Sequence, residues 1–327
     1  MNPWKKILSA VMAAAVCLSV AGCSSAAVDD DEVVMHVGDY DVTAEHYNYY
    51  FLNEKYSQDS GDSSYWTDVA ASNTSLKEAA DNSIKQFYAM KKMCDDAGIT
   101  LNEAQNAQVE EEIAMLEENF GGEEAFNQVL ASNYMSLELY RQLSEESLRT
   151  ISLFETLFGD QIRERVANDY LRAAHILIQF DESAEDAETD KAAAKAEAEE
   201  VLEKIQNGED FFALVDEYND DPGMVDNTDG YYFTEGEMVT PFYEGAIALE
   251  EGEVSDLVET EYGYHIIKRL PMEQEYIDAN LMNFVSTEMY EDFFSQVEET
   301  QNSMEVTTES TYDKINLENA IKNEQNA

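Results

Sequence analysis

Basic side chains are scarce in this 327-residue sequence. It contains 19 lysines and arginines against 70 aspartates and glutamates, which gives a formal net charge of −51 at pH 7. Nucleic-acid binding needs a positive surface that displaces counterions, so the imbalance argues against that class of function. It also repels anionic lipid headgroups, so attachment to a membrane would need a lipid group rather than a basic patch. The hydrophobic content of 44% nevertheless supports folded cores rather than an acidic disordered chain.

Cysteine is equally rare, with three residues in the whole chain. Cys17 lies within an N-terminal apolar run and Cys23 soon follows it, which leaves Cys94 by itself in the rest of the sequence. One cysteine can build neither a disulfide framework nor a cysteine-based metal site. Cys94 continues the helical spacing of Ile84 and Phe87, which favours a buried position on a helix face over a reactive thiol.

The N-terminal residues have the layout of a secretory signal. Two lysines precede an apolar run at 7–20, which is too short for a membrane-spanning helix. The sequence VAGC at 20–23 resembles a bacterial lipobox and implies that Cys23 is the lipidated first residue of the mature protein. We therefore expect a lipoprotein signal peptide at 1–22 and a lipid-anchored tether at 23–32. Ordinary signal cleavage beside an incidental cysteine is the alternative.

The length suits two folded units, and the first is expected at 33–166. Val33–Thr43 predicts a strand, a glycine turn and a returning strand, and several amphipathic helices follow in a mostly helical, chaperone-like domain. The sequence TLNE at 100–103 predicts a capping box at the start of one of them. His36 and His46 lie in this domain without a third ligand at metal spacing, which favours surface or packing roles.

A second domain is expected around the other two of the chain's four histidines. His175 lies in the aliphatic run AAHILI at 173–178, and His265 lies in YGYHII at 262–267; both runs are typical of strands. The segments between them predict the element order β-α-α-β-α-β-β. Such an order gives a four-stranded sheet with helices packed on it, so the fold class is α+β.

These segments resemble the parvulin family of peptidyl-prolyl isomerases in their order and spacing. Besides the two histidine runs, the resemblance rests on FTEGEMVTPF at 233–242 and GEVS at 252–255. It implies a parvulin-like domain at 169–271 that isomerises X–Pro bonds. The sequence VGDYDVTAEHYNYY at 37–50 is similar, less specifically, to the N-terminal region of extracytoplasmic foldases of the PrsA and SurA type.

The resemblance implies an apolar pocket for the proline ring, formed by Met238 and Phe242 with Phe233 supporting it. Rotation about an X–Pro bond must cross a barrier of ~18–20 kcal/mol, because the twisting amide loses double-bond character. A catalyst that favours the twisted amide needs no nucleophile, so we expect neither a cofactor nor a metal. Plain core roles are the alternative for these side chains, and the flanking Gly236 and Pro241 count against it.

The polar part of the implied site consists of two histidines and an aspartate. His175 and His265 would form a hydrogen-bonded pair beneath the pocket, and Asp221 falls where parvulins carry a cysteine or aspartate that faces the amide carbonyl. A solvated or calcium-binding loop is the alternative for Asp220, Asp221 and Asp226, although EF-hand spacing is absent. One segment departs from the family pattern: where parvulins read Gly-Gly-Asp-Leu-Gly before the aromatic strand, this chain has NTDGY at 227–231. That change bears on the start of the strand and on the catalytic rate.

The segment after this domain is predicted to return to the first one. An apolar stripe within 272–300 predicts an amphipathic helix, and the resemblance implies that it packs on the N-terminal domain, with 301–327 as a polar tail. The whole pattern predicts a lipid-anchored foldase outside the cytoplasm that acts on incompletely folded secreted proteins with X–Pro bonds. Its oligomeric state is left open, with a homodimer among the alternatives. A parvulin-like binding module with little turnover is the competing function; a solute-capturing lipoprotein would need a two-lobe α/β pattern that is missing.

Overall fold

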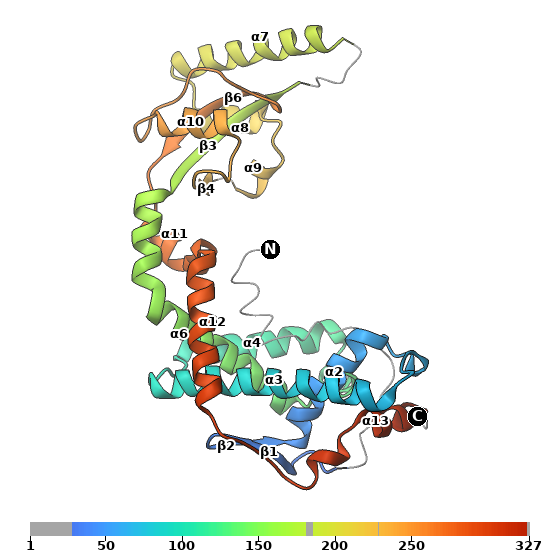
Figure 1. Cartoon of the computed structure of the whole chain (residues 1–327). Helices are drawn as coiled ribbons and strands as arrows, with labels where there is room; N and C mark the ends of the chain where they lie inside the picture. The colour runs from blue at the N-terminus through green and yellow to red at the C-terminus, as the bar shows by residue number, and fades with distance from the viewer. Residues whose placement is uncertain (1–27, 181–185, 228, 326–327) are drawn as a thin grey trace. The chain divides into compact units, whose positions relative to one another are not determined.

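The chain forms two compact units (Figure 1). The computed structural model describes most of the sequence: residues 28–180, 186–227 and 229–325. Unit 1 consists of the residues up to 159 together with 285–327, and unit 2 consists of residues 160–284. The predicted signal peptide, the predicted lipidation site Cys23 and the first half of the predicted tether lie outside the described residues. None of the helices that are described is long and apolar enough to cross a membrane.

Unit 1 is mostly helical and carries a small antiparallel sheet. Its helices are α2 (Ala44–Asp59), α3 (Val69–Asp96), α4 (Glu103–Phe120), α5 (Glu123–Ser132), the part of α6 (Leu137–Asp169) up to residue 159, α12 (Thr287–Ser303) and α13 (Leu317–Gln325). Its strands are β1 (Val33–Val37), β2 (Tyr40–Thr43) and β7 (Val306–Thr308), in the order β2-β1-β7. Helix α2 packs against α3 and against β1 and β2, and Phe51 and Ile84 are fully buried in the shared core.

The capping box predicted for α4 lies two residues later than expected. Asn102 is the N-cap and accepts a hydrogen bond from the backbone N–H of Gln105, whose side chain in turn accepts from the Asn102 N–H. The sequence predicts Thr100 as the N-cap because Glu103 follows it three residues later, as a capping box requires. Asparagine caps helices better than threonine and glutamine suits the third helical position, so the later pair prevails.

The predicted C-terminal helix at 272–300 is wrong as a single element. The structure divides it into α11 (Gln274–Ala279) and a 3-10 turn (Leu281–Phe284) in unit 2, followed by α12 in unit 1. The break has a local cause, because the Ser286 side chain accepts a hydrogen bond from the Met289 N–H and so starts a new helix.

The predicted polar tail at 301–327 is also more than a tail. Strand β7 pairs with β1, opposite Met35, His36 and Val37, and therefore satisfies backbone groups at the edge of that strand. Leu317, at the start of α13, is fully buried in the core of unit 1. The residues after α12 therefore complete the fold of unit 1.

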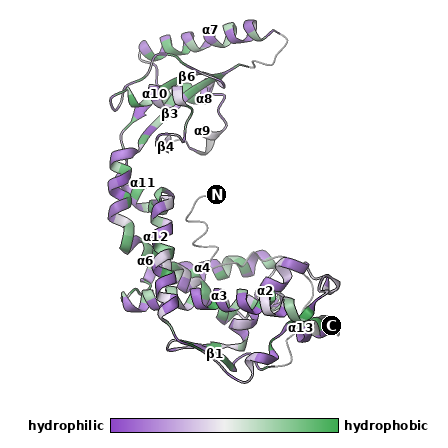
Figure 2. Cartoon of the chain, viewed as in Figure 1, coloured by the Kyte–Doolittle hydropathy of each residue, from purple (hydrophilic) through white to green (hydrophobic). Residues whose placement is uncertain are grey.

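Unit 2 contains the predicted four-stranded antiparallel sheet, in the order β4-β3-β6-β5. The strands are β3 (Leu171–Gln179), β4 (Tyr231–Phe233), β5 (Val258–Thr260) and β6 (Gly263–Leu270). The helices are α7 (Ala187–Gln206), α8 (Phe211–Tyr218), α9 (Gly223–Asp226), α10 (Thr240–Ile247) and α11, as well as the end of α6. The central strands β3 and β6 contain most of the hydrophobic residues of the sheet (Figure 2). The α+β class expected from the sequence is confirmed.

The two faces of this sheet are covered by different helices. Side chains of α7 and α8 pack against Ala174, Ile176 and Ile178 on one face, whereas α10 packs against Ala173 and the rest of the other face. The alternation of side chains along β3 produces this division and places His175 on the α10 face. The β5–β6 turn needs its glycine: Gly263 has φ of +152°, and a Cβ there would lie 2.2 Å from the carbonyl oxygen of Ile178.

Candidate active site

The central strands of unit 2 place His175 and His265 side by side. His265 lies opposite Leu177 in the antiparallel register, so His175 is its diagonal neighbour on the same face of the sheet. The two Nδ1 atoms are 3.2 Å apart, and the ring centroids are 5.1 Å apart. Both residues are buried, with 6% and 4% exposure. The structure thus brings together the two histidines that the sequence predicts as a pair.

Asp221 reaches this pair from the loop that follows α8. Its Oδ2 lies 2.9 Å from His175 Nε2 and accepts the Tyr231 hydroxyl at 2.8 Å, while its Oδ1 accepts the Gly223 N–H at 2.9 Å. The hydrogen bond from His175 is the largest influence holding the pKa of the Asp221 carboxyl well below its usual range, against an opposite effect of partial burial. Asp221 is therefore an anion that is hydrogen-bonded through both oxygens.

The loop carrying Asp221 continues the edge of β3. Strand β4 pairs only with the first three residues of β3, and the backbone beyond them is satisfied by the loop instead. The Leu177 N–H donates to Asn219 Oδ1 at 2.8 Å, and the Gln179 N–H donates to Asp220 Oδ2 at 2.9 Å. Asn219 Nδ2 also donates to the Asp221 carbonyl at 3.0 Å. The Asp220 carboxylate thus accepts a backbone N–H at the edge of β3, which is a structural role.

Asp221, His175 and His265 lie in a row of polar contacts, and Thr260 extends this row beyond His265. Its Oγ1 lies 2.8 Å from His265 Nε2. Burial, reinforced by the neighbouring His175, lowers the pKa of His265 to about 3, so this ring is neutral. A neutral imidazole has one donor and one acceptor. Because the Asp221 carboxylate only accepts, His175 Nε2–H donates to it; the neutral His265 ring donates through one nitrogen and accepts through the other in its contacts with His175 and Thr260.

Sequence reasoning missed Thr260 and Tyr231 as members of this network. Tyr231 lies in the NTDGY segment that departs from the parvulin pattern, so that departure was the available signal. Thr260 lies at the end of β5 and opposite Gly263 in the register, and only strand pairing brings its hydroxyl to His265. No spacing rule within the sequence identifies such a contact.

The apolar side of the site is formed by α10 and β4. Phe242 lies edge-on to both imidazoles, with centroid distances of 5.2 Å to His175 and 5.4 Å to His265. Phe233 lies 5.6 Å from Phe242 in the same manner. Both phenyl rings are almost completely buried, with 2% and 1% exposure, whereas Met238 is half-buried against the same cluster. Phe233 and Phe242 are therefore core side chains beside the histidine pair, and Met238 is the most exposed of the three residues predicted for the proline pocket.

The remaining sequence candidates lie elsewhere. Cys94 is fully buried in α3, and burial raises the pKa of its thiol to about 11, in keeping with the predicted helix-face position. His36 lies near the surface between the carboxylates of Asp41 and Glu309, and His46 is buried among aromatic rings. Within the described ranges, no group of three or more histidine, cysteine, aspartate or glutamate side chains is arranged to hold a metal ion.

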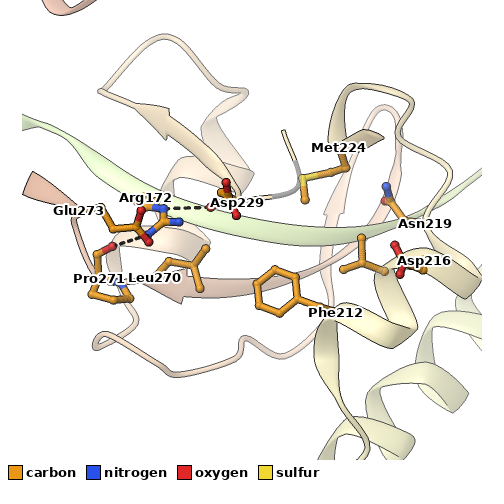
Figure 3. A pocket seen from close by; sticks show the side chains of 10 residues that line it. Arg172, Phe212, Asp216, Asn219, Met224, Asp229, Leu270, Pro271 and Glu273 are labelled. Carbon is orange, nitrogen blue, oxygen red and sulfur yellow. Dashed lines mark hydrogen bonds and ion pairs between the residues drawn. The ribbon is translucent and has the colours of Figure 1, made fainter. Parts of the chain in front are cut away.

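A separate cavity of about 690 Å³ lies on the other face of the sheet (Figure 3). Phe212, Met224 and Leu270 line its middle, and Arg172 and Glu273 lie together at one end. The Arg172 guanidinium is occupied there, since it donates to the Glu273 carboxylate at 2.6 Å and to the carbonyl oxygens of residues 229 and 271. Arg172 points to the face opposite His175, so this cavity is not the histidine site.

Two family models match the chain in the regions that correspond to the two units. Residues 160–271 match the PPIC-type PPIASE domain, and residues 2–154 match the SurA-like N-terminal domain. The first range coincides closely with unit 2 and includes the histidine pair, Asp221 and the Phe242 cluster.

Individual curated proteins that are similar to this chain are foldases named PrsA. The foldase protein PrsA of Oceanobacillus iheyensis is 30% identical over 196 residues, which are 58% of this chain and 58% of that protein. PrsA of Geobacillus kaustophilus is 43% identical over 99 residues, 30% of each. The chain therefore matches about half or less of the length of these curated relatives. The crystal structure of PrsA from Bacillus subtilis is 24% identical and covers 84% of this chain and 91% of its own, with a TM-score of 0.29. The chain is thus similar to a PPIC-type PPIase domain over residues 160–271 and to a SurA-like N-terminal domain over residues 2–154, and it resembles curated PrsA foldases over part of its length.

Proposed function

We propose that unit 2 catalyses cis-trans isomerisation of X–Pro bonds in partly folded proteins. The observation that best supports this function is the continuous row of hydrogen bonds from Thr260 through the two histidines to Asp221, directly beside the buried Phe242 ring. Such a row fixes the tautomer and orientation of both imidazoles without leaving a nucleophile free. It suits a reaction that breaks no covalent bond.

The chemistry follows from the polarity of the amide. The planar amide is the more polar form, because resonance places negative charge on its oxygen and positive charge on its nitrogen. An apolar surface formed by Met238 above Phe242 would hold the proline ring and exclude water from that amide. Loss of water destabilises the planar form more than the twisted one, so the barrier falls. The preorganised imidazoles below supply a fixed polar environment that does not need to rearrange.

The test is a comparison of the wild type with Asp221→Ala. We expect the variant to fold normally and to isomerise an X–Pro peptide at least about tenfold more slowly, because His175 loses the partner that orients it. This corresponds to an activation free energy that is ~1.4 kcal/mol higher. Asp216→Ala is the matched control, since it removes an exposed carboxylate from α8 near the other cavity. A wild-type chain that fails to accelerate proline-limited refolding would falsify the isomerase proposal.

A client-binding module with little turnover is the second candidate. It is favoured by one observation: the NTDGY segment differs from the family pattern, and its Tyr231 contacts the carboxylate that the resemblance places at the reacting amide. The two candidates differ in one measurement. A binding module suppresses aggregation of an unfolding client without speeding its proline-limited phase, and Asp221→Ala leaves that suppression unchanged.

Location and clients form a separate part of the proposal. We infer from the lipobox-like VAGC sequence that Cys23 is lipidated and that the chain is attached to the outer side of a cell membrane, where secreted proteins fold. Cys23→Ala is expected to release the protein into the medium or to leave it unprocessed. Membrane fractionation with intact-mass measurement checks this, and unchanged processing and fractionation would contradict it. Cys23→Ser serves as a second variant, because it retains the size of the side chain but not the thiol.

A further inference from the structure

Tyr231 stands where the parvulin pattern has a glycine, and its side chain enters the polar network. Its hydroxyl donates to Asp221 Oδ2 at 2.8 Å. Its ring lies near-perpendicular to the His175 ring, with a centroid distance of 5.8 Å. Tyr231 pairs with Ala173 in the β3–β4 register, two residues before His175, so it lies on the same face of the sheet.

A second position is matched to that hydroxyl. A Cβ on Gly223 would lie 2.2 Å from the Tyr231 hydroxyl oxygen and 3.2 Å from Asp221 Oδ1. The Gly223 backbone has no positive φ, so any residue could adopt its conformation, and the hydroxyl is what excludes a side chain. The Gly223 N–H also donates to Asp221 Oδ1. Tyr231 and Gly223 therefore bind the same carboxylate from two elements, β4 and α9.

We propose that Tyr231 is a positioning residue that, together with Gly223, holds Asp221 as an anion directed at His175, so that Asp221 acts through His175 rather than on the substrate amide. An ionised carboxylate only accepts hydrogen bonds, and an amide carbonyl oxygen also only accepts. An anionic Asp221 can therefore not bind that oxygen, whereas it can orient the His175 ring. This changes the role that the family resemblance implies for Asp221, and its catalytic meaning rests on the proposed isomerase function.

The groups that face the Asp221 carboxylate come from four elements. They are His175 on β3, Tyr231 on β4, the Gly223 N–H on α9 and, at longer range, His265 on β6. Each hydrogen bond to the carboxylate favours its charged form. Removal of one donor should therefore move the titration of Asp221 to higher pH, whereas loss of packing alone would admit water and move it to lower pH.

The test is an NMR titration of the Asp221 carboxyl carbon and the His175 imidazole nitrogens in the full chain. We expect Tyr231→Phe to raise the Asp221 midpoint by roughly one pH unit and to lower kcat/KM about three- to tenfold, with the acid limb of its pH profile moved the same way. Tyr232→Phe is the matched control, because it removes a hydroxyl one residue further along, on the opposite face, where its ring stacks on Tyr276. That variant should titrate like the wild type.

Gly223→Ala provides an independent second variant. As a single substitution, it should displace the Tyr231 hydroxyl and raise the Asp221 midpoint. In the Tyr231→Phe background, where the clashing hydroxyl is gone, its effect on kcat/KM should be at least about threefold smaller. The proposal is overturned if the Asp221 midpoint is unchanged in Tyr231→Phe. If Tyr231→Phe does not fold, an unchanged midpoint in Gly223→Ala overturns it instead. Additive effects of the two substitutions overturn it as well. If the wild type has no isomerase activity, the proposed function is wrong. The titration still tests whether Tyr231 positions Asp221.

Discussion

Unit 1 buries one histidine and unit 2 buries two, and their surroundings differ. His46 of unit 1 is 2% exposed and packs against Phe87 and Tyr88, with Nδ1 3.2 Å from the Tyr88 hydroxyl and no hydrogen-bond partner for Nε2 among the described residues. His265 of unit 2 is 4% exposed and hydrogen-bonded through both nitrogens. Burial lowers the pKa of each to about 3. A depressed histidine pKa therefore does not by itself identify a site; what sets His265 apart is its place in a row of hydrogen bonds that leads through His175 to Asp221.

The units also differ in how they bury charge. In unit 1, Lys55 and Asp59 form an ion pair at 2.6 Å with 1% and 0% side-chain exposure, and the Trp66 indole donates to the same Asp59 oxygen at 2.7 Å. In unit 2, the Asp221 side chain keeps 23% exposure beside the histidines. A sealed pair stabilises its own unit, whereas a partly accessible anion beside two imidazoles is available for function.

The largest expected effect is on the sealed pair of unit 1. Lys55→Ala should destabilise unit 1 by about 3–5 kcal/mol, because it leaves the Asp59 charge buried without its cation. Isomerisation by unit 2 should stay within about twofold of wild type at temperatures where both units are folded. Urea unfolding followed by the fluorescence of Trp66 measures the first effect, and a peptide assay measures the second.

The control for that prediction is Lys322→Ala. Lys322 pairs with Glu318 at the surface, with 59% and 68% exposure, so its loss should change stability by less than about 0.5 kcal/mol. A Lys55→Ala variant as stable as this control would show that the buried pair is not what distinguishes the two units.

The next effect concerns the boundary of unit 2. A fragment of residues 160–284 should unfold at higher urea than one of 169–271, the range that the sequence predicts, by about 1–3 kcal/mol. The shorter fragment lacks Glu273, which binds the buried Arg172, and Tyr276, which stacks on Tyr232 at 4.6 Å. Equal stability of the two fragments would mean that α11 contributes nothing to unit 2. Failure of both to unfold cooperatively would contradict its independence.

The smallest effect at neutral pH is expected for His46→Phe, within about 1 kcal/mol, because one ring nitrogen already lacks a partner. Its effect should appear on acidification. The folded pKa of about 3 lies below the unfolded value near 6.5, so the unfolded chain binds an extra proton between these pH values. Stability is therefore lost as pH falls from about 6 to 4, at about 1.4 kcal/mol per pH unit, and the substitution should remove that slope in unit 1.

His36 offers a comparison of opposite sign for this prediction. Hydrogen bonds that His36 donates to the Glu309 and Asp41 carboxylates raise its pKa, so it stabilises the folded state below pH 6.5 and this contribution is lost as pH rises through the folded value. His36→Ala should thus make unit 1 slightly more sensitive to acid. Urea unfolding between pH 4 and 7 distinguishes the two variants, and parallel pH profiles for both would be inconsistent with the surroundings described for these histidines.

Local patterns in the sequence determined the strands that carry the site. The aliphatic runs around His175 and His265, and the Gly236 and Pro241 that flank Met238, predict elements whose side-chain periods decide which residues share a face. The order of elements then leads to the four-stranded sheet, since few arrangements cover both of its faces. The histidine pair and the three apolar candidates were implied by the parvulin resemblance, and the regular periods of β3, β6 and α10 explain why His175, His265 and Phe242 meet on one face.

Only the tertiary structure decided the contacts made by irregular segments. The loop at Asn219–Asp221 continues the edge of β3 because β4 is too short to do so, and this places Asp221 against both His175 and Tyr231. Strand β7 pairs with β1 although about 270 residues separate them. Such contacts depend on where the chain returns in space and on which backbone groups remain unpaired there, and no local sequence period records either.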